Sequence, residues 1–135
     1  MSVTFDGVDK MVGNLKVVAT SRRAAMGDAL FYEMKYSELP EVQARTPVDT
    51  GALVASEHAE GPFEVGSKVS ATIVAGGPTA PYAVYVHEDL DAIHPVGEAK
   101  FVESVLKESK SFMAARVAAR MRETLKRVMY FGETV

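Results

Sequence analysis

The sequence contains no cysteine and no tryptophan, and the missing cysteine excludes several kinds of chemistry. A disulfide scaffold, a thiolate zinc site and a cysteine nucleophile are all ruled out. No apolar run approaches the roughly 20 residues that a membrane-spanning helix needs. The opening MSVTFDGVDK also lacks the basic-then-apolar order of a signal peptide. We therefore expect a soluble, intracellular chain with no membrane partner.

The 135 residues suit a single domain over 1–135, and 47% of them are hydrophobic and can build its core. The formal net charge is only −3, but the charges are unevenly distributed along the chain. Residues 1–65 hold ten Asp and Glu against six Lys and Arg, whereas residues 104–135 hold seven Lys and Arg against three Glu. The chain is acidic at its front and basic in its last third, and such a dipolar subunit suits head-to-tail packing.

Helices are expected near both ends of the chain. Apolar residues recur at three- and four-residue spacing over about 6–37 and again over about 97–129. Pro40 and Pro47 are expected to stop the first helix before Leu39, because proline cannot continue a helix. The segment of about 38–51 is then expected to be a loop.

The middle of the chain, about 52–88, predicts three or four short antiparallel strands. Val69–Gly77 and Tyr82–Glu88 carry β-branched residues with partial alternation, whereas Ala52–Gly61 is a weaker candidate that also fits a helix. Gly66-Ser67-Lys68 predicts a hairpin turn. With a loop over 89–96 and the long C-terminal helix packed on this sheet, the fold class is α+β.

Histidine offers the main candidate for metal or acid–base chemistry. The segment HEDLDAIH, from His87 to His94, also contains three carboxylates, so a divalent-metal site at His87, Asp91 and His94 is one interpretation. The spacing matches neither the HExxH helix face nor the calcium loop. The other interpretation is a polar loop whose histidines bond to backbone groups, and on this interpretation no metal is expected.

No pattern for nucleophilic catalysis is present. No serine stands in a Gly-x-Ser-x-Gly elbow. Thr50 and Ser56 lie near Asp49 and His58 in sequence, but triad residues normally converge from separate elements. Gly76-Gly77-Pro78 lacks the Lys-Ser/Thr ending of a phosphate loop. We expect a chain that is not an enzyme, with no catalytic residue and no cofactor.

Three arginines of the predicted last helix form a basic row: Arg116, Arg120 and Arg127. They are four and seven residues apart and therefore share one helix face. Such a row can contact the phosphates of DNA, form a subunit interface, or be the solvated face of an amphipathic helix. No aromatic residues interleave with it to stack on bases. All three uses remain open.

The most distinctive string is ARTPVDTGAL, from Ala44 to Leu53. Pro47 fixes an extended approach, and Asp49 can make an Asx-turn or cap the amides that follow it. Gly51 permits a positive φ immediately before the predicted sheet. The string therefore predicts a turn that positions the first strand.

Within this string, TPVDTGAL resembles the signature of the tail-component family of long-tailed bacteriophages, whose members complete or terminate the tail. The stretch PYAVYVHEDLDAIHPVGEAKFVESVL, residues 81–106, resembles the second pattern of that family: Tyr-Ala, a short strand, His-Glu, a variable loop, then Gly-x-x-Lys-Phe opening the last helix. Both motifs stand in the family's order. One departure is Val54, where related sequences usually place a basic residue.

The resemblance implies a structural virion protein that forms a ring, commonly a hexamer, at the head–tail junction or the tail terminus. Its implied partners are further copies of itself, the head–tail adaptor or connector, tail-tube proteins and DNA passing through the lumen. It implies no catalytic, cofactor or metal residues. The alternatives are a minor capsid protein, or a nucleic-acid-binding accessory protein that uses the basic helix.

Two sets of residues are candidates for assembly contacts, although each of them could equally be a folding residue. The loop candidates are Thr46, Pro47, Val48, Asp49, Thr50, Gly51 and Leu53. The candidates for a sheet edge are Tyr82, Tyr85, His87 and Glu88. The long predicted loop is expected to reach a neighbouring subunit or a partner ring.

Overall fold

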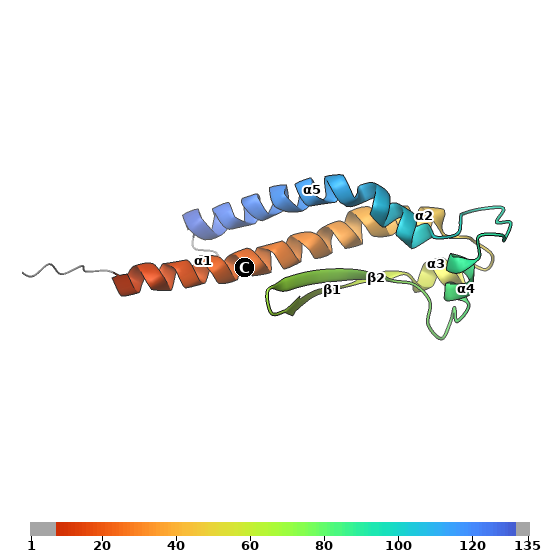
Figure 1. Cartoon of the computed structure of the whole chain (residues 1–135), viewed down its shortest axis with the longest axis horizontal. Helices are drawn as coiled ribbons and strands as arrows, with labels where there is room; N and C mark the ends of the chain where they lie inside the picture. Colours follow the sequence, from red (N-terminus) through yellow and green to blue (C-terminus); the bar gives the residue numbers. More distant parts are fainter. Residues whose placement is uncertain (1–7, 132–135) are drawn as a thin grey trace, which may run out of the picture.

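A computed structural model describes residues 8–131 of the chain and confirms the α+β class. The elements in chain order are α1 (Val8–Glu33), η1 (Met34–Glu38), α2 (Leu39–Arg45), α3 (Ala52–Ser56), β1 (His58–Val65), β2 (Lys68–Val74), α4 (Ala83–Glu88) and α5 (Phe101–Phe131). Figure 1 shows an elongated molecule in which α1 and α5 run antiparallel and the β-hairpin lies along the other side of α1. The short helices α2, α3 and α4 gather at one end. Within the described residues, no helix is long and apolar enough to span a membrane.

The first helical segment is longer than predicted. It does not end before Leu39, since α1 passes through the π-helical segment η1 directly into α2 and the helical backbone continues to Arg45. The Leu39 N–H donates to the Met34 carbonyl, five residues back. Pro40 is tolerated because it stands in the first turn of α2, just after the ladder has changed from α to π spacing. The predicted loop 38–51 is therefore wrong over 38–45, and the predicted start at residue 6 lies outside the described residues.

The sheet has two strands among the described residues, fewer than the three or four predicted. β1 and β2 pair antiparallel and are joined at Gly66-Ser67, so the predicted hairpin is present. Ala52–Gly61 divides into α3 and the start of β1. The buried Leu53 holds α3 against the core, and the Ala55 N–H donates to the Gly51 carbonyl at 3.0 Å.

The predicted strand Tyr82–Glu88 is the short helix α4 instead. The Val86 N–H donates to the Tyr82 carbonyl at 3.1 Å, as in a helical turn. Ala83 and Val86, three residues apart, face the core, while the intervening Val84 and Tyr85 are exposed. Inward positions three apart fit a helix and not a strand, where they would be two apart.

The described part of α5 begins at Phe101, four residues later than predicted, and it packs mainly along α1. The hairpin also packs mainly on α1, so α1 lies between α5 and the sheet, and the expectation that α5 covers the sheet is corrected (Figure 1). The core lies toward the end where α2, α3 and α4 gather. It is built from Met34, Val42, Leu53, Ile73, Ala80, Ala83, Phe101 and Val105.

Candidate functional site

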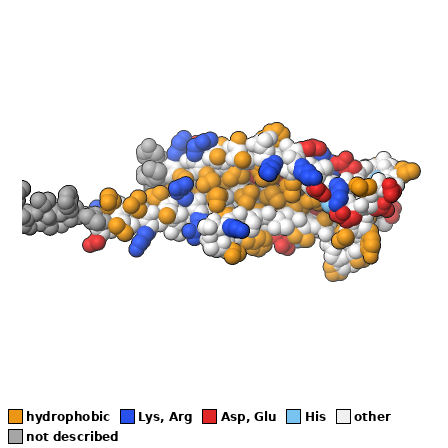
Figure 2. All heavy atoms as spheres, in the orientation of Figure 1, with side chains coloured by type: hydrophobic (Ala, Val, Ile, Leu, Met, Phe, Trp, Pro, Cys, Tyr) orange, Lys and Arg blue, Asp and Glu red, His pale blue; other side chains and the backbone are white. Residues whose placement is uncertain are grey.

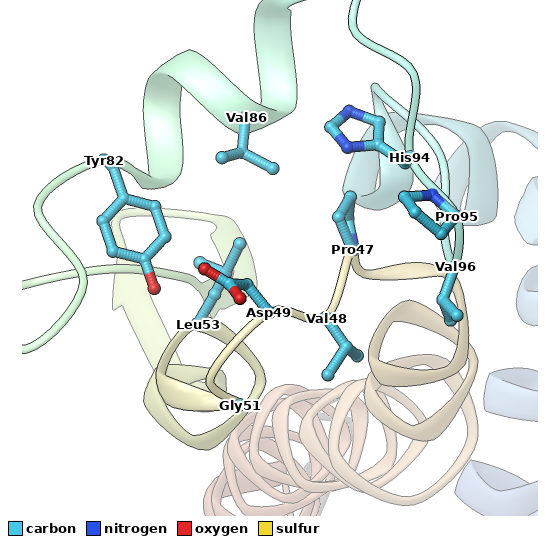
Figure 3. Close-up of a pocket in the computed structure, with 10 residues that line it drawn as sticks. All are labelled: Pro47, Val48, Asp49, Gly51, Leu53, Tyr82, Val86, His94, Pro95 and Val96. Carbon is cyan, nitrogen blue, oxygen red and sulfur yellow. The ribbon is translucent and has the colours of Figure 1, made fainter.

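A pocket of about 520 Å³ lies at the end of the molecule that holds α3 and α4. It joins the two sequence motifs, because its lining comes from the turn after α2, from α4 and from the segment before α5 (Figure 3). The lining residues are Pro47, Val48, Asp49, Gly51, Leu53, Tyr82, Val86, His94, Pro95 and Val96. We refer to this end, residues 46–56 and 82–97, as the tip.

The TPVDTG string is a turn that leads from α2 into α3. Thr46 is fully buried, and its N–H and hydroxyl both lie within hydrogen-bond distance of the Val42 carbonyl, at 2.9 and 2.8 Å. The Thr50 hydroxyl oxygen accepts from the Ala52 N–H at 3.4 Å, and Gly51 adopts a φ of 81°. The turn therefore positions a short helix, where the sequence predicted a strand.

Asp49 lies at the pocket itself. Figure 3 shows its carboxylate on the same side of the pocket as the Tyr82 hydroxyl, with the His94 ring across from them. Nε2 of His94 is buried and has no hydrogen-bond partner among the described residues. The pocket thus has a mainly apolar lining with one exposed carboxylate and one imidazole.

Glu57 lies behind the turn and is buried, although it belongs to neither motif. Its Oε1 lies 2.6 Å from the Thr46 hydroxyl, and its Oε2 has no partner among the described residues. Burial raises the pKa of the Glu57 carboxyl, and the contact with Thr46 offsets part of that rise. The turn is therefore fastened to the start of β1 through a titratable group.

The second motif joins α4 to the start of α5 through side-chain and backbone contacts. The Lys100 N–H donates to the His87 carbonyl at 2.7 Å, and the Lys100 ammonium pairs with Glu88. The His87 ring and the buried Phe101 ring meet edge to face, with 4.9 Å between the ring centroids. The Lys100 contact lowers the pKa of Glu88. His87 and Glu88, predicted at a sheet edge, are therefore helical residues that fasten two elements together.

The two motifs also touch through their backbones. The Glu98 N–H donates to the Arg45 carbonyl at 2.9 Å, which ties the segment before α5 to the end of α2. The Arg45 guanidinium makes two parallel bonds to Glu108 of α5, at 2.9 and 2.6 Å. Gly97 lies directly against Pro47. These contacts hold together the two segments that line the pocket.

Large apolar side chains are exposed on the outer surface of the tip, and three of them, Val48, Tyr82 and Val96, line the pocket. Val48, Tyr82, Val84, Tyr85, Leu90, Ile93 and Val96 are all exposed. Of the predicted contact residues, Val48, Asp49, Tyr82 and Tyr85 therefore lie on the surface, whereas Thr46 and Leu53 are buried. The arrangement offers shape and apolar contact to a partner.

The histidines do not build a metal centre among the described residues, where no group of three His, Cys, Asp or Glu side chains could hold an ion. Nδ1 of His87 lies 2.8 Å from Glu88, and Asp89 accepts from the Asp91 N–H at 3.1 Å. His58 contacts the Ser56 carbonyl at 2.8 Å and Glu60 at 3.1 Å, and these two contacts raise its pKa. Across HEDLDAIH, the side chains of His87, Asp91 and His94 do not converge.

The basic row is divided by the fold. Arg116 pairs with Glu33 at 2.8 Å and with Glu38, and both of these carboxylates are buried. The Arg120 guanidinium lies over the Tyr32 ring, 3.4 Å from its centroid, and 3.6 Å from Glu33. Arg127 is exposed. Two of the three arginines thus hold α5 against α1 and η1.

Sequence reasoning missed Glu33, Glu38 and Glu57, and it missed the pocket residues Val86, Pro95 and Val96. A signal for the exposed apolar surface was present, since Leu90, Ile93 and Val96 interrupt an otherwise polar loop. Glu33 and Glu38 carried no such signal, because their arginine partners lie 78 to 87 residues away along the chain. No family model, no curated protein and no solved structure matches this chain.

Proposed function

We propose that the chain is a structural virion protein of a tailed phage, a subunit of a ring at the head–tail junction or the tail terminus. It contacts further copies of itself, most simply as a hexamer, with the head–tail connector on one side and the tail tube on the other. DNA passes through the lumen. The role needs neither a catalytic residue nor a cofactor.

One observation carries the proposal: the two phage-like motifs, far apart in sequence, meet in a single apolar pocket at the tip. Two of their charged residues are paired at the surface, Lys100 with Glu88 and Arg45 with Glu108 of α5. Apolar members of both motifs, Val48, Tyr82 and Val96, are exposed and line the pocket. Exposed apolar surface of this kind favours a protein contact.

The basic helix gives less support to a nucleic-acid-binding role. Arg116 and Arg120 compensate Glu33 and Glu38, so a phosphate would have to compete with buried carboxylates for them. A ring subunit can leave both arginines paired with their carboxylates.

The test removes the chain from the phage or prophage that encodes it, by a stop codon early in its reading frame. The expected particles are filled heads and separate tails in electron micrographs, with joining restored by a plasmid copy of the wild-type chain. An epitope-tagged chain should be labelled by gold at the neck or tail end. Intact virions without the chain, or gold over the capsid shell, would overturn the assignment.

A further inference from the structure

The first half of α1, residues 9–20, is not covered by any other part of the chain that the structure describes. Every side chain from Asp9 to Thr20 is exposed, including Met11 at 58% and Leu15 at 60%. Figure 1 shows this end of α1 running beyond the hairpin. A group of exposed apolar side chains of this kind points to a partner outside the fold.

These apolar side chains have the spacing of a helix that seats in a groove. Met11, Leu15 and Val18 follow an i, i+4, i+7 pattern and therefore lie on one face. At the opposite end of the molecule, the tip presents a mainly apolar pocket whose lining includes the exposed side chains of Val48 and Val96, 50% and 56% exposed. The molecule thus has an apolar projection at one end and an apolar receptor at the other.

The charges of the two ends are complementary. Lys10, Lys16, Arg22 and Arg23 are exposed on the first part of α1. Asp49, Asp89 and Asp91 are exposed at the tip, and Glu88 beside them is paired with Lys100. Figure 2 shows basic side chains spread over the α1 end and acidic ones concentrated toward the tip. Two like ends repel each other, so the favoured contact joins opposite ends of two copies.

We propose that residues 9–20 of α1 from one copy dock on the tip of a second copy. Met11, Leu15 and Val18 cover the pocket, while Lys10 and Lys16 lie beside Asp49 and Asp91. Because the two surfaces differ, the contact is heterologous and each copy can both give and receive a helix. Such a contact closes into a ring where the rotation permits, and in this respect it rests on the proposed function.

The test uses two variants of the full chain that damage opposite ends. Met11→Asp with Leu15→Asp removes the donor face, and Val48→Asp with Val96→Asp removes the receptor face. All four side chains are exposed, so helical circular dichroism should stay unchanged. Each variant should weaken self-association by about 30-fold or more, as measured by sedimentation velocity. Val65→Asp, an exposed apolar change on the hairpin, is the matched control and should assemble like the wild type.

Mixing the two variants gives the decisive result. One copy keeps a good donor and the other a good receptor, so the mixture should form a 1:1 dimer and nothing larger. A mixture that stays monomeric while the wild type assembles would overturn the contact, as would a wild type that remains monomeric at millimolar concentration. The assay uses the purified chain alone, so its failure is distinct from that of the virion role.

Discussion

The Thr46 hydroxyl lies between two acceptors, 2.8 Å from the Val42 carbonyl and 2.6 Å from Oε1 of the buried Glu57. One hydroxyl proton serves one acceptor at a time. When Glu57 is protonated, its own O–H can donate to Thr46 while Thr46 donates to Val42, and both contacts are satisfied together. When Glu57 is ionised, its carboxylate can instead accept from Thr46, and this contact offsets part of the rise that burial gives to the pKa of Glu57.

Glu57 should make the stability of the chain fall with rising pH. Between its ordinary pKa of 4.5 and its raised folded value, the folded chain binds more protons at Glu57 than the unfolded chain does. The free energy of unfolding contributed by this group is therefore full below pH 4.5 and decreases as pH rises through the folded pKa. Urea unfolding of the wild type and of Glu57→Gln, from pH 4.5 to 8, should show that decrease in the wild type alone.

The control for this effect is Thr46→Val, which keeps the side-chain volume and removes the hydroxyl. It should cost about 1–3 kcal/mol, because a buried carboxyl loses its hydrogen-bond partner. The pH dependence should become steeper, since the Thr46 contact lowers the pKa of Glu57. Parallel pH profiles for wild type and Glu57→Gln would contradict the role given to Glu57.

Arg116 should matter far more to stability than Arg127 on the same helix. Arg116→Met leaves the buried Glu33 and Glu38 with less compensation. The expected loss is about 3 kcal/mol, at the low end for a broken buried pair because the Arg116 side chain is 41% exposed. Arg127→Met, at an exposed position, should stay within about 0.5 kcal/mol. Equal losses in denaturant melts would show that the buried carboxylates do not depend on Arg116.

Gly97 should tolerate no side chain, whereas Gly51 should tolerate alanine at a modest cost. Both have positive φ, 89° and 81°, so both variants bear a similar backbone penalty of about 1 kcal/mol. A Cβ at Gly97 would also lie 2.5 Å from the Pro47 nitrogen and 2.7 Å from the Arg45 carbonyl oxygen. A Cβ at Gly51 would meet open space instead. Gly97→Ala should therefore lose at least about 2 kcal/mol more than Gly51→Ala in thermal or urea unfolding. Equal losses would mean that the two motifs are not held this closely.

Phe101 should be the residue through which the contact between α4 and α5 stabilises the core. It is 0% exposed, and Phe101→Ala should cost about 3–5 kcal/mol because it leaves a cavity beside the core. Phe112 on the same helix is 56% exposed, and Phe112→Ala should cost about 1 kcal/mol or less. Similar losses of unfolding free energy for Phe101→Ala and Phe112→Ala in urea would contradict the placement of the core at the start of α5.

The sequence by itself determined the two long helices and the hairpin turn, because these features depend on periodicity and local turn chemistry. The tertiary structure decided the short segments. Tyr82–Glu88 has a pattern compatible with a strand, and it is a helix because the core accepts Ala83 and Val86 on one side. Pro40 lies inside a continuous helical segment because the π segment η1 directly precedes it, and the sequence shows no sign of that segment.

The candidate site divides in the same way. The sequence singled out TPVDTGAL and the His-Glu and Lys-Phe pairs as the distinctive residues, since their turn chemistry and order are visible along the chain. Only the tertiary structure decided that Thr46 and Phe101 are buried, that Val48 and Asp49 line a pocket, and that Arg116 serves Glu33 and Glu38. The physical reason is that burial and ion pairing depend on residues distant in the chain, and one sequence carries no record of which distant side chains meet.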